Sequence, residues 1–206
     1  MSNPYQIPPA HDGMTIGLYG GTFDPPHDGH RHVAETALRR LALDSLWWMV
    51  TPGNPLKTLD GLCPLTERIR SARHLAGQNP KLIVTALEAG FTSRFTAETI
   101  ATLIKKCPRA RFVWVMGADN LATFHKWQDW QSIARQVPIA IIDRPGSTFS
   151  ALSSRTAQAL RAYRKAETSA ARLAAQQTPA WTFLHDRKIP ISSTDIRDLR
   201  GGRNTS

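Results

Sequence analysis

The stretch Ile16–His32 reads IGLYGGTFDPPHDGHRH and decides the first unit of the fold. An apolar run typical of a strand comes first. Gly20 and Gly21 then allow a sharp turn in which the backbone can come close to a bound group. A helix is predicted to begin near Gly29, with apolar residues at helical spacing after it. Because the free N–H groups and the dipole of a helix N-terminus attract anions, the stretch predicts a phosphate-binding loop.

Two histidines, His27 and His30, stand at the start of this predicted helix. Imidazoles at that place can donate hydrogen bonds to phosphate oxygens, where charge increases as a phosphoryl bond changes partners. Two other interpretations stay open, namely ordinary surface histidines and a metal site that also uses Asp24 and Asp28. The two prolines in the loop and the lack of a second ligand cluster argue against a closed metal site, so no metal ligands are predicted.

The rest of the chain alternates between strand-like and helix-like patterns. Predicted strands lie at 14–19, 45–51, 82–87, 111–116, 138–142 and 181–184. Predicted helices lie at 29–43, 65–77, 95–106 and 127–136. Alternation of this kind indicates βαβ units, and the continuously apolar middle strands are typical of a parallel sheet that is covered on both faces. We predict an α/β fold with a Rossmann-like, doubly wound open sheet and a ligand crevice at the carboxyl ends of its strands.

The domain organisation is expected to be simple, because 206 residues suffice for one core but not for two full domains. Residues 1–13 are predicted to be a flexible leader, and Met1 and Met14 are both possible translation starts. A single domain then spans 14–206, with a mostly helical C-terminal portion at 150–206. Within it, the Ala- and Arg-rich residues 150–177 predict one helix or two on the outer face.

Composition limits the partners. The formal net charge is +10, which suits polyanionic small substrates or nucleic acid, but no RNA-recognition or zinc-finger signature accompanies it. We therefore expect no nucleic-acid partner. No apolar run approaches the ~20 residues of a membrane helix, so no membrane partner is expected. Cys63 and Cys107 lack metal or redox spacing, which favours a reduced cytoplasmic protein. A homo-oligomer stays possible.

Two motifs carry a resemblance to a known family. Gly20–His30 (GGTFDPPHDGH) resembles the H-x-G-H signature of the nucleotidyltransferase superfamily, in the longer form found in bacterial nicotinate-nucleotide adenylyltransferases. Ile191–Arg197 (ISSTDIR) is similar to the superfamily's I-S-S-T-x-I-R motif. The resemblance implies adenylyl transfer from ATP, bound with Mg²⁺, to nicotinate mononucleotide, which yields deamido-NAD and pyrophosphate. It also implies catalytic roles for His27, His30 and Arg197.

The same resemblance and the chemistry of the residues assign the nucleotide site. The ATP-binding set is Gly20, Gly21, Thr22, Phe23, His27, His30, Lys57, Gly117, Asp119, Ser193, Thr194 and Arg197. In it, Lys57 matches the family lysine, whereas Leu56 stands where many members have histidine. Asp119 follows a strand, where acidic residues accept hydrogen bonds from ribose hydroxyls, although it could instead cap a helix. Arg197 suits bidentate contact with phosphate oxygens.

The predicted mononucleotide site comprises Asp24, Phe95, Thr96, Trp127 and Arg144. Thr96 matches the family threonine at a helix start, where it could bind the nicotinate carboxylate, cap the helix, or do both. Phe95 replaces the tyrosine that members often carry. Trp127 matches the family tryptophan that stacks on the pyridine ring, and Trp130 is assigned to the core. Arg144 resembles the arginine of the family's R-P-G and could be purely structural.

Other functions remain as alternatives. A transferase of the same superfamily could use nicotinamide mononucleotide, phosphopantetheine or a CTP-dependent acceptor. A non-catalytic nucleotide sensor would keep the fold without turnover, and an RNA-binding module would use the positive charge. The intact phosphate motifs and Trp127 favour the pyridine nucleotide transferase.

Overall fold

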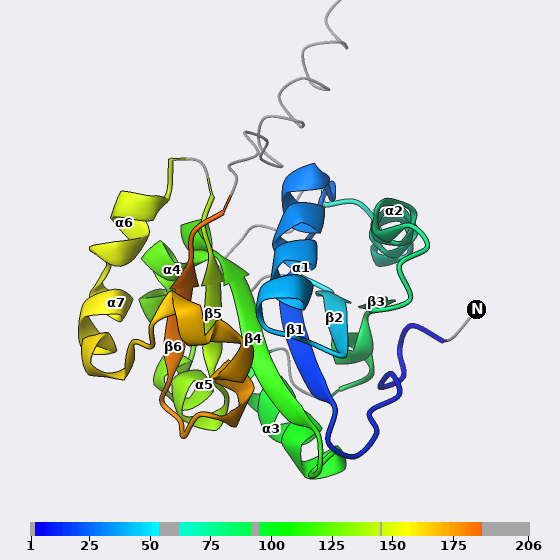
Figure 1. Ribbon diagram of the computed structural model, residues 1–206. Coiled ribbons are helices and arrows are strands. Elements are labelled where there is room, and N and C mark those ends of the chain that lie inside the picture. Colours follow the sequence, from blue (N-terminus) through cyan, green and yellow to red (C-terminus); the bar gives the residue numbers. More distant parts are fainter. Residues whose placement is uncertain (1–2, 54–61, 92–94, 145, 187–206) are drawn as a thin grey trace, which may run out of the picture.

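The computed structural model describes residues 3–53, 62–91, 95–144 and 146–186. Its centre is a sheet whose strands are all parallel, in the order β3-β2-β1-β4-β5-β6 (Figure 1). The strands are β1 (Thr15–Gly21), β2 (Ser45–Val50), β3 (Leu82–Thr85), β4 (Arg111–Gly117), β5 (Ile139–Ile142) and β6 (Trp181–Leu184). This order confirms the predicted doubly wound parallel sheet, because the chain runs outward from β1 in one direction and then returns to β4 beside it.

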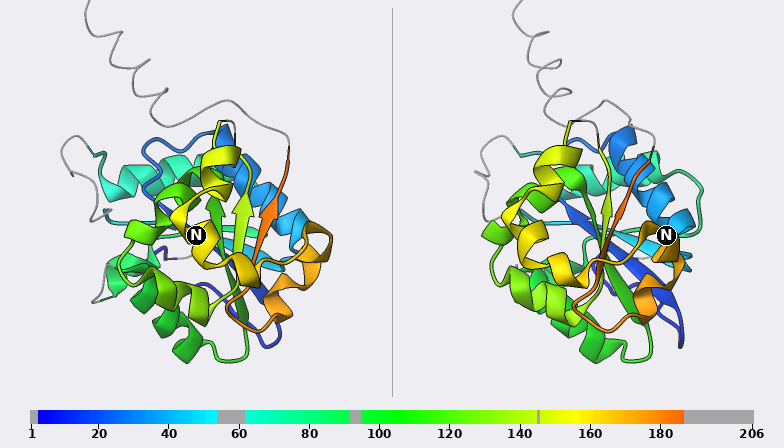
Figure 2. Two further views of the ribbon diagram at one scale, coloured as in Figure 1. Left: turned by 90° about the vertical axis from the view of Figure 1, so that its left-hand side faces the viewer. Right: turned by 60° about the vertical axis from the view of Figure 1, so that its left-hand side comes forward.

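Helices cover both faces of the sheet (Figure 2). One face carries α1 (Asp28–Arg40), α2 (Leu65–Ala76) and the 3₁₀ segment η4 (Glu167–Ala175). The other carries α3 (Thr96–Lys106), α4 (Ala118–Thr123), α5 (Trp130–Gln136), α6 (Thr148–Leu152) and α7 (Arg155–Ala159). Shorter 3₁₀ turns are η1 (Leu87–Gly90), η2 (Phe124–Lys126) and η3 (Arg161–Tyr163).

The strands are apolar along their whole length because both of their faces are buried. Trp47 and Trp48 are adjacent in β2 and both fully buried, yet they belong to the cores on opposite sides of the sheet. Successive side chains of a strand point to opposite faces, so each strand feeds both cores. Burying a large apolar side chain contributes about 1.5–3 kcal/mol, which makes the two cores the main source of stability.

The structure corrects the helix prediction at 150–177. The prediction was one helix or two, whereas this region holds two short α-helices, α6 and α7, followed by the 3₁₀ segments η3 and η4. The hydroxyl of Ser154 caps α7 by accepting from the N–H of Ala157. The chain then runs along the exposed edge of β6, where the N–H of Lys165 donates to the carbonyl of Trp181 at 2.7 Å. Pairing with the sheet edge therefore outweighs the helix propensity of the Ala- and Arg-rich sequence.

The structure also differs from the expectation of a loose leader at 1–13. The carbonyl of Pro4 accepts a hydrogen bond from the hydroxyl of Thr85, the last residue of β3 (2.8 Å), and another from the N–H of Ala86, just after β3 (2.7 Å). Ile7 and Ala10 pack against the core that contains α3. Apolar contacts and two backbone-directed hydrogen bonds thus hold residues 3–13 against the sheet.

Several boundaries move by a few residues. The predicted helix at 127–136 begins only at Trp130, and the short α4 and η2 precede it. The predicted strand at 82–87 ends at Thr85 and is followed by η1. Within the part of the chain that the structure describes, no helix has the length and apolarity required to cross a membrane.

Candidate functional site

The candidate site lies at the carboxyl edge of the sheet, where β1 and β4 are neighbours. After β1 the chain enters α1 on one face, and after β4 it enters α4 on the other. Such a change in direction leaves the carboxyl ends of the two central strands uncovered, and ligands of open α/β sheets bind there. The loop with His27 and His30 follows one of these strands, and Gly117 ends the other.

His27 and His30 adopt a fixed arrangement at the N-terminus of α1. His27 is the N-cap residue and is buried, and its N–H donates to Nδ1 of His30 at 3.2 Å. The two ring centroids are 3.7 Å apart with planes inclined by 37°. Burial, and then the neighbouring His27 and Arg144, lower the pKa of His30 well below its ordinary value. Because Nδ1 accepts the backbone N–H, a neutral His30 carries its proton on Nε2, ready to donate.

The Phe23 side chain packs against the His30 ring. Its backbone has φ 51°, its side chain is only 3% exposed, and its ring centroid lies 4.9 Å from that of His30 in an edge-to-face arrangement. Tyr19 and Trp48 pack around the Phe23 ring, with centroids 5.4 Å and 5.1 Å from its own. The structure therefore places the Phe23 side chain in the core under the histidine. A side chain on Gly21 would meet the Phe23 ring at 2.9 Å, which explains the glycine.

Arg144 lies between the N-termini of α1 and α4. Its Nη1 pairs with Asp119 Oδ2 at 3.3 Å, and its side chain is largely buried. A Cβ on Gly29 would be 3.1 Å from Nη2 of Arg144, and a Cβ on Gly117 would collide with Asp119 and with Cδ of Arg144. Both glycines thus make room for the guanidinium. The structure brings this cation next to the histidines of α1, closer to the predicted triphosphate site than the sequence indicates.

Gly117 is the N-cap residue of α4, and Asp119 lies in the first turn of that helix. The alternative in which Asp119 itself caps a helix is therefore wrong. A carboxylate in the first turn is favoured by the helix dipole, and here it is also held by Arg144. Gly20 is also constrained, since a Cβ there would lie 2.8 Å from the ring of Trp114.

Arg68 is a buried residue of the site that the sequence analysis missed. It is 2% exposed, and its guanidinium donates to the carbonyls of Cys63 (2.9 Å), Thr22 (2.7 Å), Thr51 (2.8 Å) and Pro52 (3.1 Å). One side chain thereby joins the loops that follow β1 and β2. The signal was present in the sequence, because Arg68 lies on the apolar face of α2 with Ile69 and Ala72.

The predicted mononucleotide residues are spread along the same edge. Asp24 is buried and its carboxylate accepts from the N–H of Cys63 at 3.3 Å. Thr96 is the first residue of α3 and Phe95 is its N-cap, so of the two alternatives the one in which Thr96 caps this helix is wrong. Trp127 is half-buried and packs edge-to-face on Phe124, with ring centroids 5.3 Å apart.

Four predicted residues lie outside the described part of the chain: Lys57, Ser193, Thr194 and Arg197. Leu56 lies outside it as well. Trp130, assigned to the core, is half-buried against Phe124 with centroids 5.9 Å apart. Among the residues that the structure describes, no group of three or more His, Cys, Asp and Glu side chains could hold a metal ion.

The described site is suited to stabilising negative charge. It combines the N-terminus of α1, a neutral imidazole that carries its proton on Nε2, and the guanidinium of Arg144. Donors that are fixed before a ligand arrives need no reorganisation when charge develops on it. Fixed donors of this kind suit group transfer between bound substrates, in which positioning and charge stabilisation supply much of the catalysis.

Comparison with known proteins gives the chain a family. The family description "Cytidylyltransferase-like" matches residues 18–199. "Probable nicotinate-nucleotide adenylyltransferase" of Brucella abortus (strain 2308) is 56% identical over 187 residues, which cover 91% of this chain and 96% of that protein. The protein of the same name from Rhizobium meliloti (strain 1021) is 52% identical over 189 residues, which cover 92% and 100%.

A solved structure with the same fold is that of Plasmodium falciparum nicotinic acid mononucleotide adenylyltransferase complexed with NaAD. It has a TM-score of 0.67 and 18% sequence identity, and the match covers 90% of this chain and 83% of that one. At this identity the likeness concerns the fold alone, whereas the bacterial relatives share more than half of their residues with this chain. The chain therefore belongs to the cytidylyltransferase-like family, in its group of nicotinate-nucleotide adenylyltransferases.

Proposed function

We propose that this protein transfers the adenylyl group of ATP to nicotinate mononucleotide, giving deamido-NAD and pyrophosphate in NAD biosynthesis. The family membership supports the reaction class and the acceptor. The observation that carries the proposal is His30 at the N-terminus of α1, a neutral imidazole held by the His27 N–H and flanked by Arg144. A transferred phosphoryl group needs fixed donors of this kind at the oxygens where charge builds up.

The reaction is a direct in-line displacement. An oxygen of the mononucleotide phosphate forms a bond to the α-phosphorus of ATP. The bond between that phosphorus and the oxygen that bridges it to the β-phosphorus breaks, and pyrophosphate leaves. His30 Nε2 donates to the α-phosphate and leaving oxygen, with His27 beside it. Arg197, Ser193, Thr194 and Lys57 are proposed to bind the β- and γ-phosphates. Positioning and charge stabilisation account for most of the catalysis in such a step.

Mg²⁺ is proposed to bind together with ATP. A magnesium ion keeps much of its water shell and takes oxygens from substrate phosphates and one or two carboxylates. In this mode most of the ligands come from the substrate and from water, so the protein needs no dedicated set of metal ligands of its own. When bound, the ion would offset part of the triphosphate charge, while the residues named above orient the reacting groups.

The acceptor site is proposed to lie between α3 and η2. The first turn of α3, which begins at Thr96, can bind the nicotinate carboxylate through its backbone N–H groups. The half-buried Trp127 offers its ring for stacking on the pyridine, which for nucleic-acid bases contributes about 1–3 kcal/mol. Asp24 is proposed to act from the loop after β1.

The proposed partners and location follow from composition. A net charge of +10 suits ATP and nicotinate mononucleotide as polyanionic ligands, and no nucleic-acid or membrane partner is proposed. Cys63 and Cys107 are free thiols, which suits a reducing cytoplasmic compartment. Homo-oligomerisation stays a prediction.

A substrate panel tests the proposed function. The purified protein, ATP and Mg²⁺ are incubated with nicotinate mononucleotide, nicotinamide mononucleotide or phosphopantetheine, and the adenylylated product is measured. We expect the highest kcat/KM with nicotinate mononucleotide. Exclusive use of another acceptor would move the protein to a different activity within the superfamily, and absence of turnover with ATP would refute the transferase.

A further inference from the structure

Asp143 is a buried carboxylate that the proposed reaction does not use. It directly follows β5 and is 3% exposed. Its N–H donates to the carbonyl of Leu184 at 2.9 Å, which extends the pairing between β5 and β6 by one residue. A carboxylate buried this deeply is stable only when hydrogen bonds replace its water shell, so its partners indicate what it holds in place.

The Asp143 carboxylate closes the loop between β5 and α6. Its Oδ1 accepts from the N–H of Arg144 at 2.9 Å and from Oγ1 of Thr148, the first residue of α6, at 2.6 Å. The carbonyl of Arg144 accepts from the N–H of Ser147 at 3.1 Å. Helix α6 in turn packs against α4. The backbone from which the Arg144 side chain starts is therefore bonded both to the end of β5 and to the start of α6.

The Arg144 guanidinium lies in a narrow space between α1 and α4. Nη1 pairs with Asp119 of α4 at 3.3 Å, and a Cβ on Gly29 of α1 would be 3.1 Å from Nη2. A Cβ on Gly117, just before α4, would be 2.7 Å from Cδ. A long arginine side chain loses much rotamer freedom when it is confined in this way. The direction in which the backbone presents it therefore decides whether the guanidinium reaches this space.

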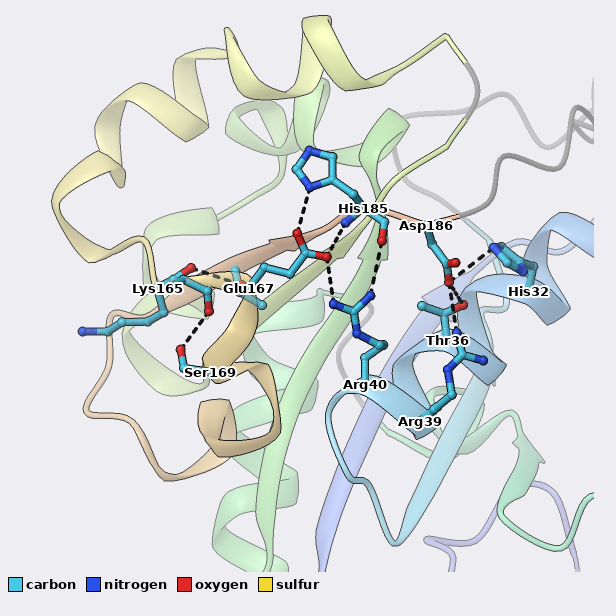
Figure 3. Close-up of polar contacts among 11 residues, drawn as sticks. His32, Thr36, Arg39, Arg40, Lys165, Glu167, Ser169, His185 and Asp186 are labelled. Carbon is cyan, nitrogen blue, oxygen red and sulfur yellow. Dashed lines mark hydrogen bonds and ion pairs between the residues drawn. The ribbon is translucent and has the colours of Figure 1, made fainter.

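The α1 side of this space is held by a separate polar cluster (Figure 3). Asp186, two residues beyond β6, accepts from Oγ1 of Thr36 at 2.5 Å and pairs with Nη2 of Arg39 at 3.3 Å. Arg40 of the same helix donates from Nη1 to the carbonyl of His185 at 3.3 Å. These contacts tie α1 to the end of β6, the strand next to β5. With α1 held in this way, the loop after β5 sets how the arginine meets the helix.

We propose that Asp143 is a positioning residue, which holds the Arg144 guanidinium beside the N-terminus of α1 through its hydrogen bonds to the Arg144 N–H and to Thr148. It acts through Arg144 and not on a substrate. A cation that is fixed before the ligand arrives needs no reorganisation when negative charge develops there. The inference rests on the proposed function, in which this helix N-terminus binds the phosphates of ATP.

The test is a double-mutant cycle in the full-length protein. Asp143→Ala removes the acceptor, Thr148→Val removes the donating hydroxyl without a change of charge, and each is combined with Arg144→Ala. In the wild-type background we expect each to lower kcat/KM for dinucleotide formation about tenfold, as for the loss of hydrogen bonds to a charged group. In the Arg144→Ala background the same substitutions should change kcat/KM less than about twofold, because the residue through which they act is gone.

Two controls match these changes. Thr148→Ser keeps the hydroxyl and should behave as the wild type. Asp44→Ala removes a carboxylate that accepts the N–H of Thr15 at 2.8 Å at the opposite, amino edge of the sheet, and it should leave kcat/KM unchanged. The inference is overturned if Asp143→Ala leaves kcat/KM unchanged, or lowers it by the same factor with and without Arg144. If Asp143→Ala does not fold, Thr148→Val decides between these outcomes.

The pKa of His30 gives a second measurement that needs no turnover. Burial and His27 lower this pKa most, and the positive charge of Arg144 lowers it further. In NMR titrations without substrate, we expect it to rise toward its ordinary value in Arg144→Ala, and also in Asp143→Ala and Thr148→Val. Loss of the Asp143 charge alone would lower it, so a rise indicates that Arg144 has moved away.

This second measurement separates the positioning role from the proposed function. If the wild type makes no dinucleotide, the proposed function fails. A rise in the pKa of His30 in both loop variants, with no further rise when Arg144→Ala is added, supports the positioning role even then. An unchanged or lowered pKa in Asp143→Ala and Thr148→Val overturns it.

Discussion

The protonation state of His30 decides how the α1 N-terminus can act on a phosphate. Burial and the nearby His27 and Arg144 keep its pKa well below the ordinary value, so the ring is neutral at physiological pH. The backbone N–H of His27 occupies Nδ1, and this fixes the tautomer with the proton on Nε2. A neutral imidazole of fixed orientation can donate a hydrogen bond to a phosphate oxygen without first gaining or losing a proton.

Trp127 tests the assignment of the acceptor site. Trp127→Ala should weaken mononucleotide binding about five- to hundredfold, because the stacking surface is lost, and should leave the affinity for ATP unchanged. The separate Kd values can be measured by calorimetry. Trp127→Phe serves as the control, since it keeps an aromatic face and the packing against Phe124. A loss of ATP affinity instead would assign the ring to the other substrate.

Glu88 makes the free energy of unfolding depend on pH, in a direction that follows from its raised pKa. It is 5% exposed, accepts from Thr99 Oγ1 at 3.1 Å, and burial raises its pKa to about 7. Its usual pKa is about 4.5, so the folded state favours the neutral acid. The stability that Glu88 contributes is complete below about pH 4.5 and is lost as the pH rises through about 7.

Glu88→Gln removes this titration while keeping an acceptor for Thr99. Relative to the wild type, the free energy of unfolding of the variant should therefore rise between pH 5 and pH 8, by about 3 kcal/mol at most. Urea unfolding at both pH values measures it. Glu67→Gln, an exposed position on α2, should show no such trend. Parallel stability curves for Glu88→Gln and the wild type would contradict the raised pKa.

Among the secondary-structure elements, α2 connects the core to the loops of the site. Arg68→Lys keeps the charge but loses the planar fork that reaches four carbonyls beyond β1 and β2. We expect a loss of about 2–3 kcal/mol in unfolding free energy and about a tenfold lower kcat/KM, since the loop after β1 is no longer fixed. Thermal unfolding and steady-state kinetics measure the two effects.

Arg70→Lys on the exposed side of the same helix is the matched control and should behave as the wild type. If Arg68→Lys matched it in both stability and kinetics, the four carbonyl contacts would not matter for the site. If only stability fell, Arg68 would serve the fold without positioning the loop.

The strands were predictable because their signal is local. β6 has the predicted bounds, Trp181–Leu184, and the apolar cores of β4 and β5 are typical of doubly buried strands. The region after α6 was not predictable in the same way. Its composition favours helix, but Lys165 bonds to the edge of β6, and no property of the local sequence reveals that edge.

The site shows the same division. The glycine-rich loop and the two histidines could be predicted, since their role depends on residues next to them in sequence. The position of Arg144 beside Gly29 and the function of Arg68 depend on contacts between distant elements. When only tertiary contacts bury a polar side chain, the local sequence gives a weak signal, such as one arginine on an otherwise apolar helix face.

For the molecule as a whole, the sheet order explains why one edge carries the chemistry. The chain starts at β1 in the middle, builds β2 and β3 outward, and then returns through β4, β5 and β6 on the other side. All strands are parallel, so the loops after them share one edge. Residues from α1, α4 and the end of β5 can therefore act on one ligand although they are far apart in sequence.

In the proposed function, His30 stabilises the charge that develops on the triphosphate during adenylyl transfer. The most direct measurement is the initial rate of pyrophosphate release from ATP and nicotinate mononucleotide by His30→Ala, together with its melting temperature. We expect a rate at least about a hundredfold below wild type, as for the loss of one preorganised donor, with the fold retained. A folded His30→Ala variant with a near-wild-type rate would contradict it.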